Sequence, residues 1–291
     1  MSAAAGIVWL ASYPKSGNTW FRIFLANLTA GERGPADIND LEERGGIASS
    51  RAEFEAVTLL DTSLLSHDVI DRLRPRVYAH LAANAGKQRW IKVHDAYAAA
   101  PGLDSMFGLT SARAVHIVRD PRDVAVSLSH HNNCSVDAAI ELMNDPRNTY
   151  AGGSAGLALQ LRQKLLGWSR HVESWMEQTD IPVMTIRYED LCCDPRRHFS
   201  AALSFVGRPA TQSEIRRAIE YADFAALQQQ ERERGFAERT SRNSLFFRSG
   251  KAGGWRGALD AKQVSLLEAA HGHTMQRLGY ALEGAIGGFP D

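Results

Sequence analysis

Cysteine is scarce in this chain, and its pattern excludes two classes of protein. The 291 residues contain three cysteines, of which Cys192 and Cys193 are adjacent. This arrangement offers neither a disulfide framework nor the ligand spacing of a metal site. We therefore expect reduced thiols in a cytoplasmic protein and no bound metal.

An excess of one charge and long apolar runs are also missing. Lys plus Arg and Asp plus Glu both total 33, so the formal net charge is zero and we expect no nucleic-acid partner. No apolar run approaches the roughly 20 residues of a membrane span, so we expect no membrane partner either. The apolar stretch 3–11 lacks the basic start of a signal peptide and is interpreted as the first buried strand.

The composition that remains, 44% hydrophobic over 291 residues, suits a large α/β fold with a buried core. Helical patterns alternate with four short apolar runs, a pattern typical of a doubly wound sheet. The four predicted strands are Ile7–Ala11, Trp90–Val93, Ala114–Val118 and Val183–Ile186. Because no repeat or linker divides the chain, we predict a single domain over 1–291, with a central parallel β-sheet flanked by helices.

The segments between the strands carry further expectations. Apolar residues at helical spacing predict helices at 157–178, 199–206, 213–222 and 261–278. Clusters of Gly, Asn, Pro and Ser predict surface loops at 30–50 and 145–156. Residues 231–257 are rich in arginine and glycine, and we expect this loop to become ordered when an anion binds.

The loop after the first strand has the features of an anion-binding site. Residues 13–20 read Tyr-Pro-Lys-Ser-Gly-Asn-Thr-Trp and lead into an apolar helical stripe. A strand, a glycine-containing loop and a helix N-terminus present backbone N–H groups and the helix dipole to an anion, and Lys15 adds its charge. The usual ATP or GTP loop places lysine after its second glycine. Lys15 instead precedes Gly17, so we predict a P-loop-like phosphate-binding loop of a different kind.

Polar side chains recur where the other predicted strands end. Lys92 and His94 close the second strand, Arg119 follows the third, and Tyr188 follows the fourth. In open α/β sheets, ligands bind beyond the carboxyl ends of the strands. Together these residues predict a polyanionic ligand beside a proton acceptor. His94 is the candidate general base because imidazole titrates near neutrality, and a buried structural histidine is the alternative.

Five segments in succession resemble the motifs of one family, the PAPS-dependent (cytosolic-type) sulfotransferases. Residues 13–20 resemble its 5′-phosphosulfate loop, and 118–127, Val-Arg-Asp-Pro-Arg-Asp-Val-Ala-Val-Ser, resemble its 3′-phosphate motif. Residues 167–175 are similar to its Trp-containing helix and 187–191 to its Tyr-Glu-Asp segment. Residues 246–255 resemble its late glycine-rich nucleotide loop, and the matches follow the family's order.

The resemblance implies transfer of a sulfuryl group from PAPS (3′-phosphoadenosine 5′-phosphosulfate) to a hydroxyl of a small organic acceptor, with PAP as product and no metal. It implies that Lys15 stabilises the leaving phosphate, that His94 is the base and that Lys92 is a second catalytic cation. The implied nucleotide-binding residues are Ser16, Gly17, Asn18, Thr19, Trp20, Arg119, Ser127, Tyr188, Phe224, Arg248, Ser249 and Gly250. For Trp20 and Tyr188, a place in the core is the alternative.

Several positions depart from the family pattern, among them Gly254 for a usual Asp, Arg256 for a usual Lys, and the changed neighbours of Lys92 and His94. Ser249 stands where the late motif usually has lysine, which removes one cation expected near the 3′-phosphate. Asn18 replaces a common threonine, a change that we associate with bacterial members. These differences concern cofactor affinity and the acceptor more than the type of reaction.

Other functions stay open on the sequence alone. A small-molecule kinase shares the phosphate-loop architecture, although the position of Lys15 and the lack of a complete Walker loop oppose it. A non-catalytic sensor of PAP or PAPS is a further alternative, which the presence of Lys15 and His94 opposes. His116, His130 and His131 are weaker candidates for the base.

The acceptor and the oligomeric state are the least constrained expectations. Aromatic side chains such as Phe54, Tyr97, Phe107 and Tyr150 lie in segments expected to form the acceptor pocket, and they favour a hydrophobic or phenolic compound. An antibiotic scaffold or a sugar hydroxyl is the alternative. A homodimer is an open alternative to a monomer.

Overall fold

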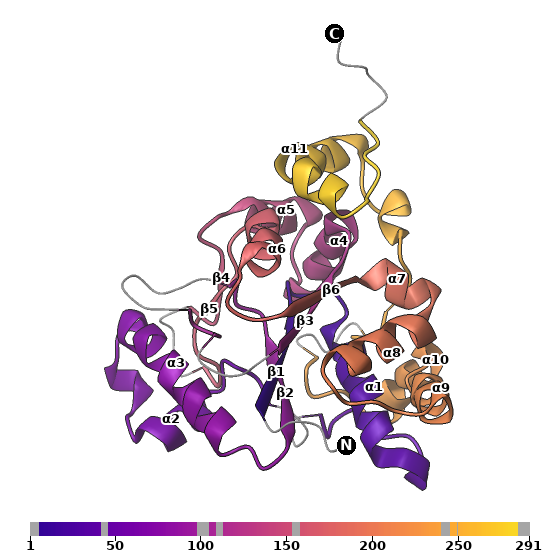
Figure 1. The fold of residues 1–291 in the computed structure, drawn as a ribbon. Coiled ribbons are helices and arrows are strands. Elements are labelled where there is room, and N and C mark those ends of the chain that lie inside the picture. The colour runs from indigo at the N-terminus through magenta and orange to yellow at the C-terminus, as the bar shows by residue number, and fades with distance from the viewer. Residues whose placement is uncertain are drawn as a thin grey trace.

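The computed structural model describes residues 6–41, 46–97, 105–108, 113–152, 158–239, 245–248 and 250–284. Helices surround a small central sheet (Figure 1). In chain order the elements are β1 Gly6–Ser12, α1 Asn18–Ala30, η1 Gly31–Arg33, α2 Arg51–Thr58, η3 Thr62–Leu64, α3 His67–Ala83, β2 Gln88–Val93, β3 Arg113–Val118, α4 Pro121–Asn132, α5 Val136–Asn144, β4 Thr149–Tyr150, β5 Gln163–Lys164, α6 Trp168–Glu177, β6 Val183–Arg187, α7 Tyr188–Cys193, α8 Pro195–Phe205, α9 Gln212–Tyr221, α10 Phe224–Arg234, η4 Gly254–Gly257 and α11 Ala261–Arg277.

The central sheet confirms the predicted fold class. Its four strands are parallel and run in the order β2-β1-β3-β6. All four predicted strands are present within two residues of their expected bounds. The register pairs Ala11 with both Val93 and His116, so the strands end at one common edge. Among the described helices, none is long and apolar enough to cross a bilayer.

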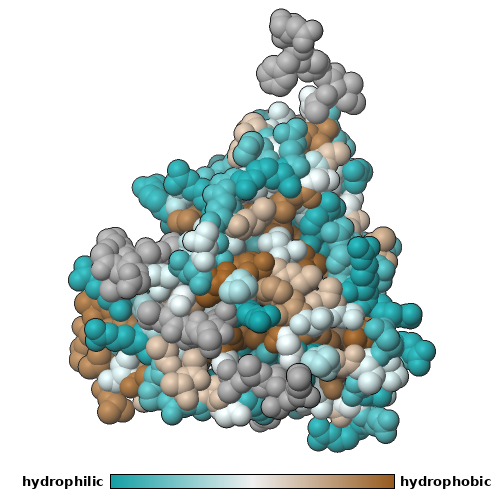
Figure 2. Space-filling view, in the orientation of Figure 1, coloured by the Kyte–Doolittle hydropathy of each residue, from teal (hydrophilic) through white to brown (hydrophobic). Residues whose placement is uncertain are grey.

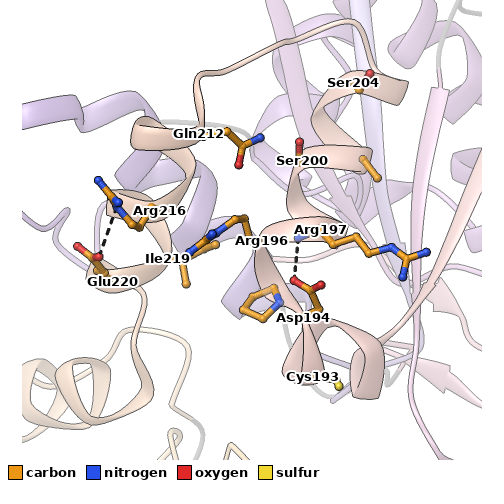
Figure 3. Close-up of a pocket in the computed structure, with 12 residues that line it drawn as sticks. Cys193, Asp194, Arg196, Arg197, Ser200, Ser204, Gln212, Arg216, Ile219 and Glu220 are labelled. Atoms are coloured by element: carbon orange, nitrogen blue, oxygen red, sulfur yellow. Dashed lines mark hydrogen bonds and ion pairs between the residues drawn. The ribbon is translucent and has the colours of Figure 1, made fainter.

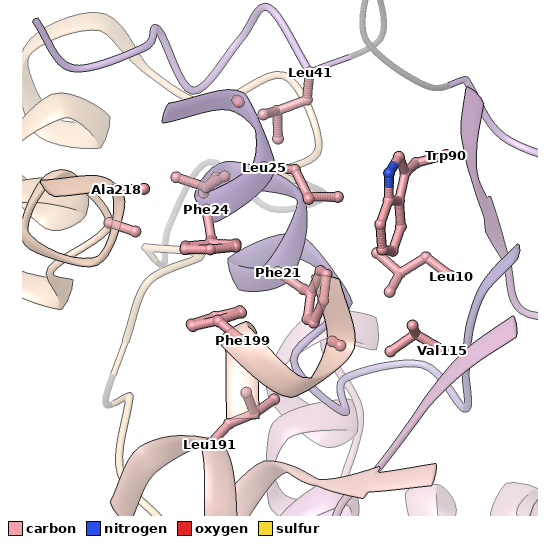
Figure 4. Packing of buried hydrophobic residues seen from close by; sticks show 14 of the residues in the cluster. Leu10, Phe21, Phe24, Leu25, Leu41, Trp90, Val115, Leu191, Phe199 and Ala218 are labelled. Carbon is pink, nitrogen blue, oxygen red and sulfur yellow. The ribbon is translucent and has the colours of Figure 1, made fainter. Parts of the chain in front are cut away.

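The first strand is buried on both faces, as expected for a parallel sheet covered by helices. Its side chains alternate, so that Leu10 enters one hydrophobic cluster and Trp9 enters another on the opposite face. On the Leu10 side, Phe24 of α1 stacks on Phe199 of α8 with ring centroids 3.8 Å apart (Figure 4). This cluster fixes α1, and therefore its N-terminus, at the end of β1.

The opposite face of the sheet is covered by α3 and α6. Trp9 packs against Tyr78 of α3 and against Phe107, with ring centroids 4.9 and 5.0 Å apart. Phe107 in turn stacks on Trp175 of α6, 5.3 Å away. Edge-to-face and offset aromatic pairs of this kind stabilise a core beyond the area that they bury.

Two predictions of local structure are wrong. The helix expected at 157–178 is only α6, Trp168–Glu177, and the preceding described residues contain β5. Leu161 and Leu165 are both buried and are four residues apart, which is also the spacing of a helix. The chain is not helical there, because Leu166 has a positive φ of 59°. The loop expected at 231–257 begins inside α10, which extends to Arg234.

A buried ion pair fixes the chain just beyond β2. The guanidinium of Arg74 in α3 donates two hydrogen bonds, of 3.0 and 2.7 Å, to the carboxylate of Asp95. Both side chains are 1% exposed. The backbone N–H of Lys164 and the indole N–H of Trp175 also donate to Asp95, at 2.9 and 3.0 Å. Three separate elements thus hold the residue that follows His94.

We predict that Asp95→Ala lowers the free energy of unfolding by about 3–5 kcal/mol, because it leaves the Arg74 cation buried without its partner. Denaturant unfolding measures this change. The control is Asp68→Ala, which removes a carboxylate that is 81% exposed and pairs with Arg162 at 3.3 Å, and its effect is much smaller. Equal losses in the two variants would contradict a stabilising role for the buried pair.

Candidate active site

The loop between β1 and α1 forms an open helix N-terminus. Gly17 is the N-cap residue of α1 with a φ of +103°, and no side chain in the described part of the protein caps this end. The first backbone N–H groups of the helix are therefore available to an anion. The buried hydroxyl of Ser16 also has no hydrogen-bond partner among the described residues.

Tyr188 packs directly beneath this loop. A Cβ atom built on Gly17 would lie 2.5 Å from Cδ2 of the Tyr188 ring, so only glycine fits. On the same ring, the guanidinium of Arg119 lies 4.6 Å from the centroid. The fold therefore brings together Gly17, Arg119 and Tyr188, three predicted nucleotide-binding residues that follow three different strands.

Arg119 connects the phosphate loop to the late glycine-rich segment. Its two terminal nitrogens donate to the carbonyl oxygens of Lys15 and Lys251, each at 3.2 Å. Its buried Nε has no partner within the described ranges. Asp123 lies 3.8 Å from Arg119 and accepts the backbone N–H of Gly253 at 2.6 Å, which holds the late segment in place.

Lys15 stands among other cations in a partly desolvated position. Its Nζ lies 3.5 Å from Nδ1 of His131 and 4.1 Å from the ring centroid of Phe246. Burial and then repulsion by Lys92 lower the pKa of Lys15 to about 8. Its φ of +70° is a strained backbone conformation for a residue with a Cβ, as is found at functional sites.

His94 is oriented by the end of β1. Its Nδ1 lies 2.8 Å from the carbonyl oxygen of Ser12 and 3.3 Å from the Ser12 hydroxyl. Donation from Nδ1–H to the carbonyl leaves the lone pair on Nε2. Burial and the nearby Lys92 ammonium hold the pKa of His94 well below its usual value, so the imidazole is neutral at pH 7 and can accept a proton. His171 donates to the backbone carbonyl of His94 at 3.1 Å.

The side chain of Asn18 is buried, and that of Trp20 is half-buried. The side-chain amide of Asn18 donates to the Leu10 carbonyl at 2.9 Å and to the Ser12 hydroxyl at 3.2 Å, which ties α1 back to β1. This leaves Asn18 its backbone N–H for a ligand. The indole N–H of Trp20 donates to the carbonyl of Ala222 at 3.0 Å, and its ring lies edge-on to Tyr188 with ring centroids 6.0 Å apart.

The remaining predicted nucleotide residues lie on α4 and on the C-terminal segments. Gly250 and Phe224 are in close contact, because a Cβ on Gly250 would lie 2.3 Å from the Phe224 ring. Arg248 is exposed, and Ser127 is half-buried on α4. Ser249 lies outside the described residues.

Two residues that the sequence did not single out complete the site. Glu238 accepts a hydrogen bond from Thr19 and forms ion pairs with Lys92 and Arg22. Arg22 follows Thr19 by one turn of α1, so helical spacing alone would have placed both on one face. No sequence signal would have found Glu238, because it reaches the site from a distant segment.

The expected acceptor aromatics fall in two groups. Phe54 and Phe107 are 2% and 1% exposed and pack in hydrophobic clusters, whereas Tyr97 and Tyr150 are half-buried. Apolar surface is visible at the lower left of Figure 2, in the region of α2 and α3. The exposed leucines there include Leu64, at 82%.

Throughout the described ranges, no group of three or more His, Cys, Asp or Glu side chains could hold a metal.

A cavity of about 840 Å³ lies elsewhere, along α8 and α9 (Figure 3). Its basic residues include Arg196 and Arg216, and Arg216 lies 3.9 Å from Glu220. None of the predicted site residues lines it. The predicted site residues that end the strands therefore lie at the carboxyl edge of the sheet and not beside this cavity.

Comparison with known proteins places the chain in a family. The profile of the sulfotransferase domain matches residues 6–279, so the chain belongs to the sulfotransferase family. Sulfotransferase 2B1 of Mus musculus is 22% identical over 281 residues, which cover 92% of this chain and 71% of the relative. The amine sulfotransferase of Oryctolagus cuniculus is 23% identical over 273 residues, covering 88% of this chain and 76% of that protein.

Solved structures share the fold. A retinol dehydratase solved with androsterone and the inactive cofactor PAP has a TM-score of 0.61 at 21% identity, over 93% of this chain and 80% of that one. The mouse sulfotransferase SULT7A1, solved with PAP, has a TM-score of 0.59 at 23% identity, over 95% of this chain and 87% of that one.

We predict that Gly17→Ala both destabilises the protein and weakens anion binding, because the new Cβ would displace the Tyr188 ring. The matched control is Gly207→Ala, where φ is +71° but nothing lies within 4 Å of the added Cβ. The control loses about 1–2 kcal/mol from backbone strain alone, and Gly17→Ala loses more. Denaturant unfolding of both variants compares them, and equal losses would show that the Tyr188 contact is unimportant.

Proposed function

We propose that this protein transfers a sulfuryl group from PAPS to a hydroxyl of a small organic acceptor. The observation that carries the proposal is the juxtaposition of an open anion-binding helix terminus, two lysines and a neutral histidine at one sheet edge, in a chain of the sulfotransferase family. We take residues 1–291 as one sulfotransferase domain acting in the cytoplasm. A homodimer is compatible with this proposal.

The residues present fit the nucleotide. Ser16 Oγ and Arg119 Nε are buried polar atoms without partners among the described residues, and such atoms normally have one. The proposal assigns Ser16 to the 5′-phosphosulfate and Arg119 to the 3′-phosphate. Arg119 would bind phosphate with its planar guanidinium, and Ser127, Arg248 and Gly250 would complete that end.

The residues of the chain have distinct tasks in the transfer. When bound, PAPS supplies the sulfuryl group. His94 Nε2 accepts the proton of the acceptor hydroxyl as its oxygen bonds to sulfur. Lys15 donates a hydrogen bond to the bridging oxygen, which keeps the electron pair of the broken sulfur–oxygen bond and leaves as part of PAP. Lys92 stabilises the charge on the sulfuryl oxygens, so the reaction depends on positioning and electrostatics.

The acceptor is proposed to be a hydrophobic or phenolic alcohol. Retinol dehydratase structures that resemble this chain contain androsterone or retinol. The half-buried rings of Tyr97 and Tyr150 lie in segments assigned to the acceptor pocket.

The direct test is incubation with PAPS and a panel of phenols, alcohols and sugars, followed by mass spectrometry of the acceptors. We expect a sulfate adduct on at least one hydroxyl compound. A parallel incubation with ATP and Mg²⁺ tests the kinase alternative. A phosphorylated product, or binding of PAPS without any transfer, would overturn the proposal.

Lys15→Ala and His94→Ala are each predicted to lower kcat roughly 10²- to 10⁴-fold. The histidine variant keeps most of its affinity for PAP, because His94 acts on the acceptor proton. His130→Ala, an exposed histidine on α4, is the matched control and keeps its turnover. Steady-state kinetics and calorimetry measure both properties, and near-normal turnover of His94→Ala would remove it as the base.

Arg119→Ala is predicted to weaken PAP binding about 10- to 100-fold, the effect of a lost charge-assisted hydrogen bond. Binding of AMP, which lacks the 3′-phosphate, falls much less. The exposed Arg232→Ala serves as the control for net charge. Calorimetry with both nucleotides separates the two effects; equal losses for PAP and AMP would refute the assignment to the 3′-phosphate.

A further inference from the structure

The carboxylate of Glu238 occupies a small subsite made by three donors. Its Oε1 pairs with Nη1 of Arg22, and its Oε2 lies 3.4 Å from both Lys92 Nζ and Thr19 Oγ1. Arg22, Lys92 and Glu238 are only 10%, 13% and 26% exposed. Burial alone would raise the pKa of Glu238, but Lys92 and Arg22 outweigh burial and lower it to about 2. The group is therefore an anion at every working pH.

The donors of this subsite belong to the elements that build the phosphate loop. Thr19 and Arg22 lie one turn apart at the start of α1, and Lys92 lies on β2 beside β1. The charge of Glu238 also reaches Lys15 and His131, where it opposes the lowering of their pKa values by burial. A carboxylate thus stands at the centre of a site that is otherwise lined by cations.

We infer that Arg22 extends the phosphosulfate-binding set and that Glu238 is an internal counter-ion, which competes with the nucleotide for Thr19, Arg22 and Lys92. The inference rests on the proposed function, because that function assigns Thr19 and Lys92 to the 5′ end of PAPS. A carboxylate and a phosphate seek the same donors, and the three groups cannot satisfy both at once. Nucleotide binding therefore requires Glu238 to withdraw.

The chain immediately before Glu238 is anchored by packing and by a backbone hydrogen bond. Phe236 is buried and packs against Phe246 and Phe247, with ring centroids 4.8 and 5.2 Å apart. Asn39 accepts the backbone N–H of Ala237 at 2.8 Å. The side chain of Glu238 projects from this anchored base, so its withdrawal needs no unfolding of α10.

Competition of this kind lowers the apparent affinity for the ligand by the fraction of molecules whose subsite is open. Removing the carboxylate should therefore tighten binding, whereas removing a residue that assists binding should weaken it. We expect Glu238→Gln and Glu238→Ala to bind PAP about tenfold more tightly than the unmodified protein. Isothermal calorimetry at fixed ionic strength measures this change.

Glu233→Gln is the matched control, because it removes one negative charge from an exposed position in α10. It reproduces the change in net charge and should leave the affinity for PAP nearly unchanged. Thermal unfolding of each variant verifies that it is folded. Unchanged or weaker PAP binding in both Glu238 variants overturns the inference, as does equal tightening in the Glu233 control.

The contribution of Arg22 is tested in the Glu238→Gln background, where no carboxylate competes for it. Adding Arg22→Gln should then weaken PAP binding about tenfold, and no effect would remove Arg22 from the binding set. If the unmodified protein and Glu238→Gln both fail to bind PAP, the proposed function fails together with this inference. If the unmodified protein binds PAP and Glu238→Gln binds no better, the inference alone fails.

Discussion

Repulsion between cations that are partly removed from solvent is the constraint on which this site depends. Lys92 and Arg119 both lower the pKa of Lys15, after burial itself. Such a cluster is unfavourable in the absence of an anion, and any ligand that supplies several negative charges relieves it. Glu238 provides part of that relief within the protein. The preference for a polyanionic nucleotide is thus a property of the charge arrangement itself.

A rigid frame keeps these cations from separating. Phe24 and Phe199 hold α1 against the sheet, and Asn18 ties the start of α1 to β1. On the other side of the site, His171 and the Arg74–Asp95 pair fix the chain around His94. Because the frame is set by packing and buried hydrogen bonds, the side chains meet a ligand in a largely prearranged geometry, which favours electrostatic catalysis.

Much of this arrangement is predictable from the sequence. The strands are recognisable as short apolar runs in the sequence. Parallel topology then places Lys92, His94 and Arg119 at the carboxyl edge of the sheet. Local sequence patterns fail where tertiary contacts determine the local structure. Leu161 and Leu165 have helical spacing but lie outside any helix, and the helices α2, α3, α5 and α7 lie in segments for which no helix is predicted. Glu238 reaches the site through its ion pair with Lys92, which is 146 residues away in the chain. Local sequence patterns carry no information about such a contact.

The central claim is that the carboxyl edge of the sheet binds a doubly phosphorylated adenosine. A crystal structure of the protein grown with PAP tests it most directly. We expect the 5′-phosphate against the backbone of 15–19, the 3′-phosphate beside Arg119, and Glu238 displaced from Lys92. Density for PAP at another place, such as the cavity along α8 and α9, with Glu238 still paired to Arg22, would contradict it.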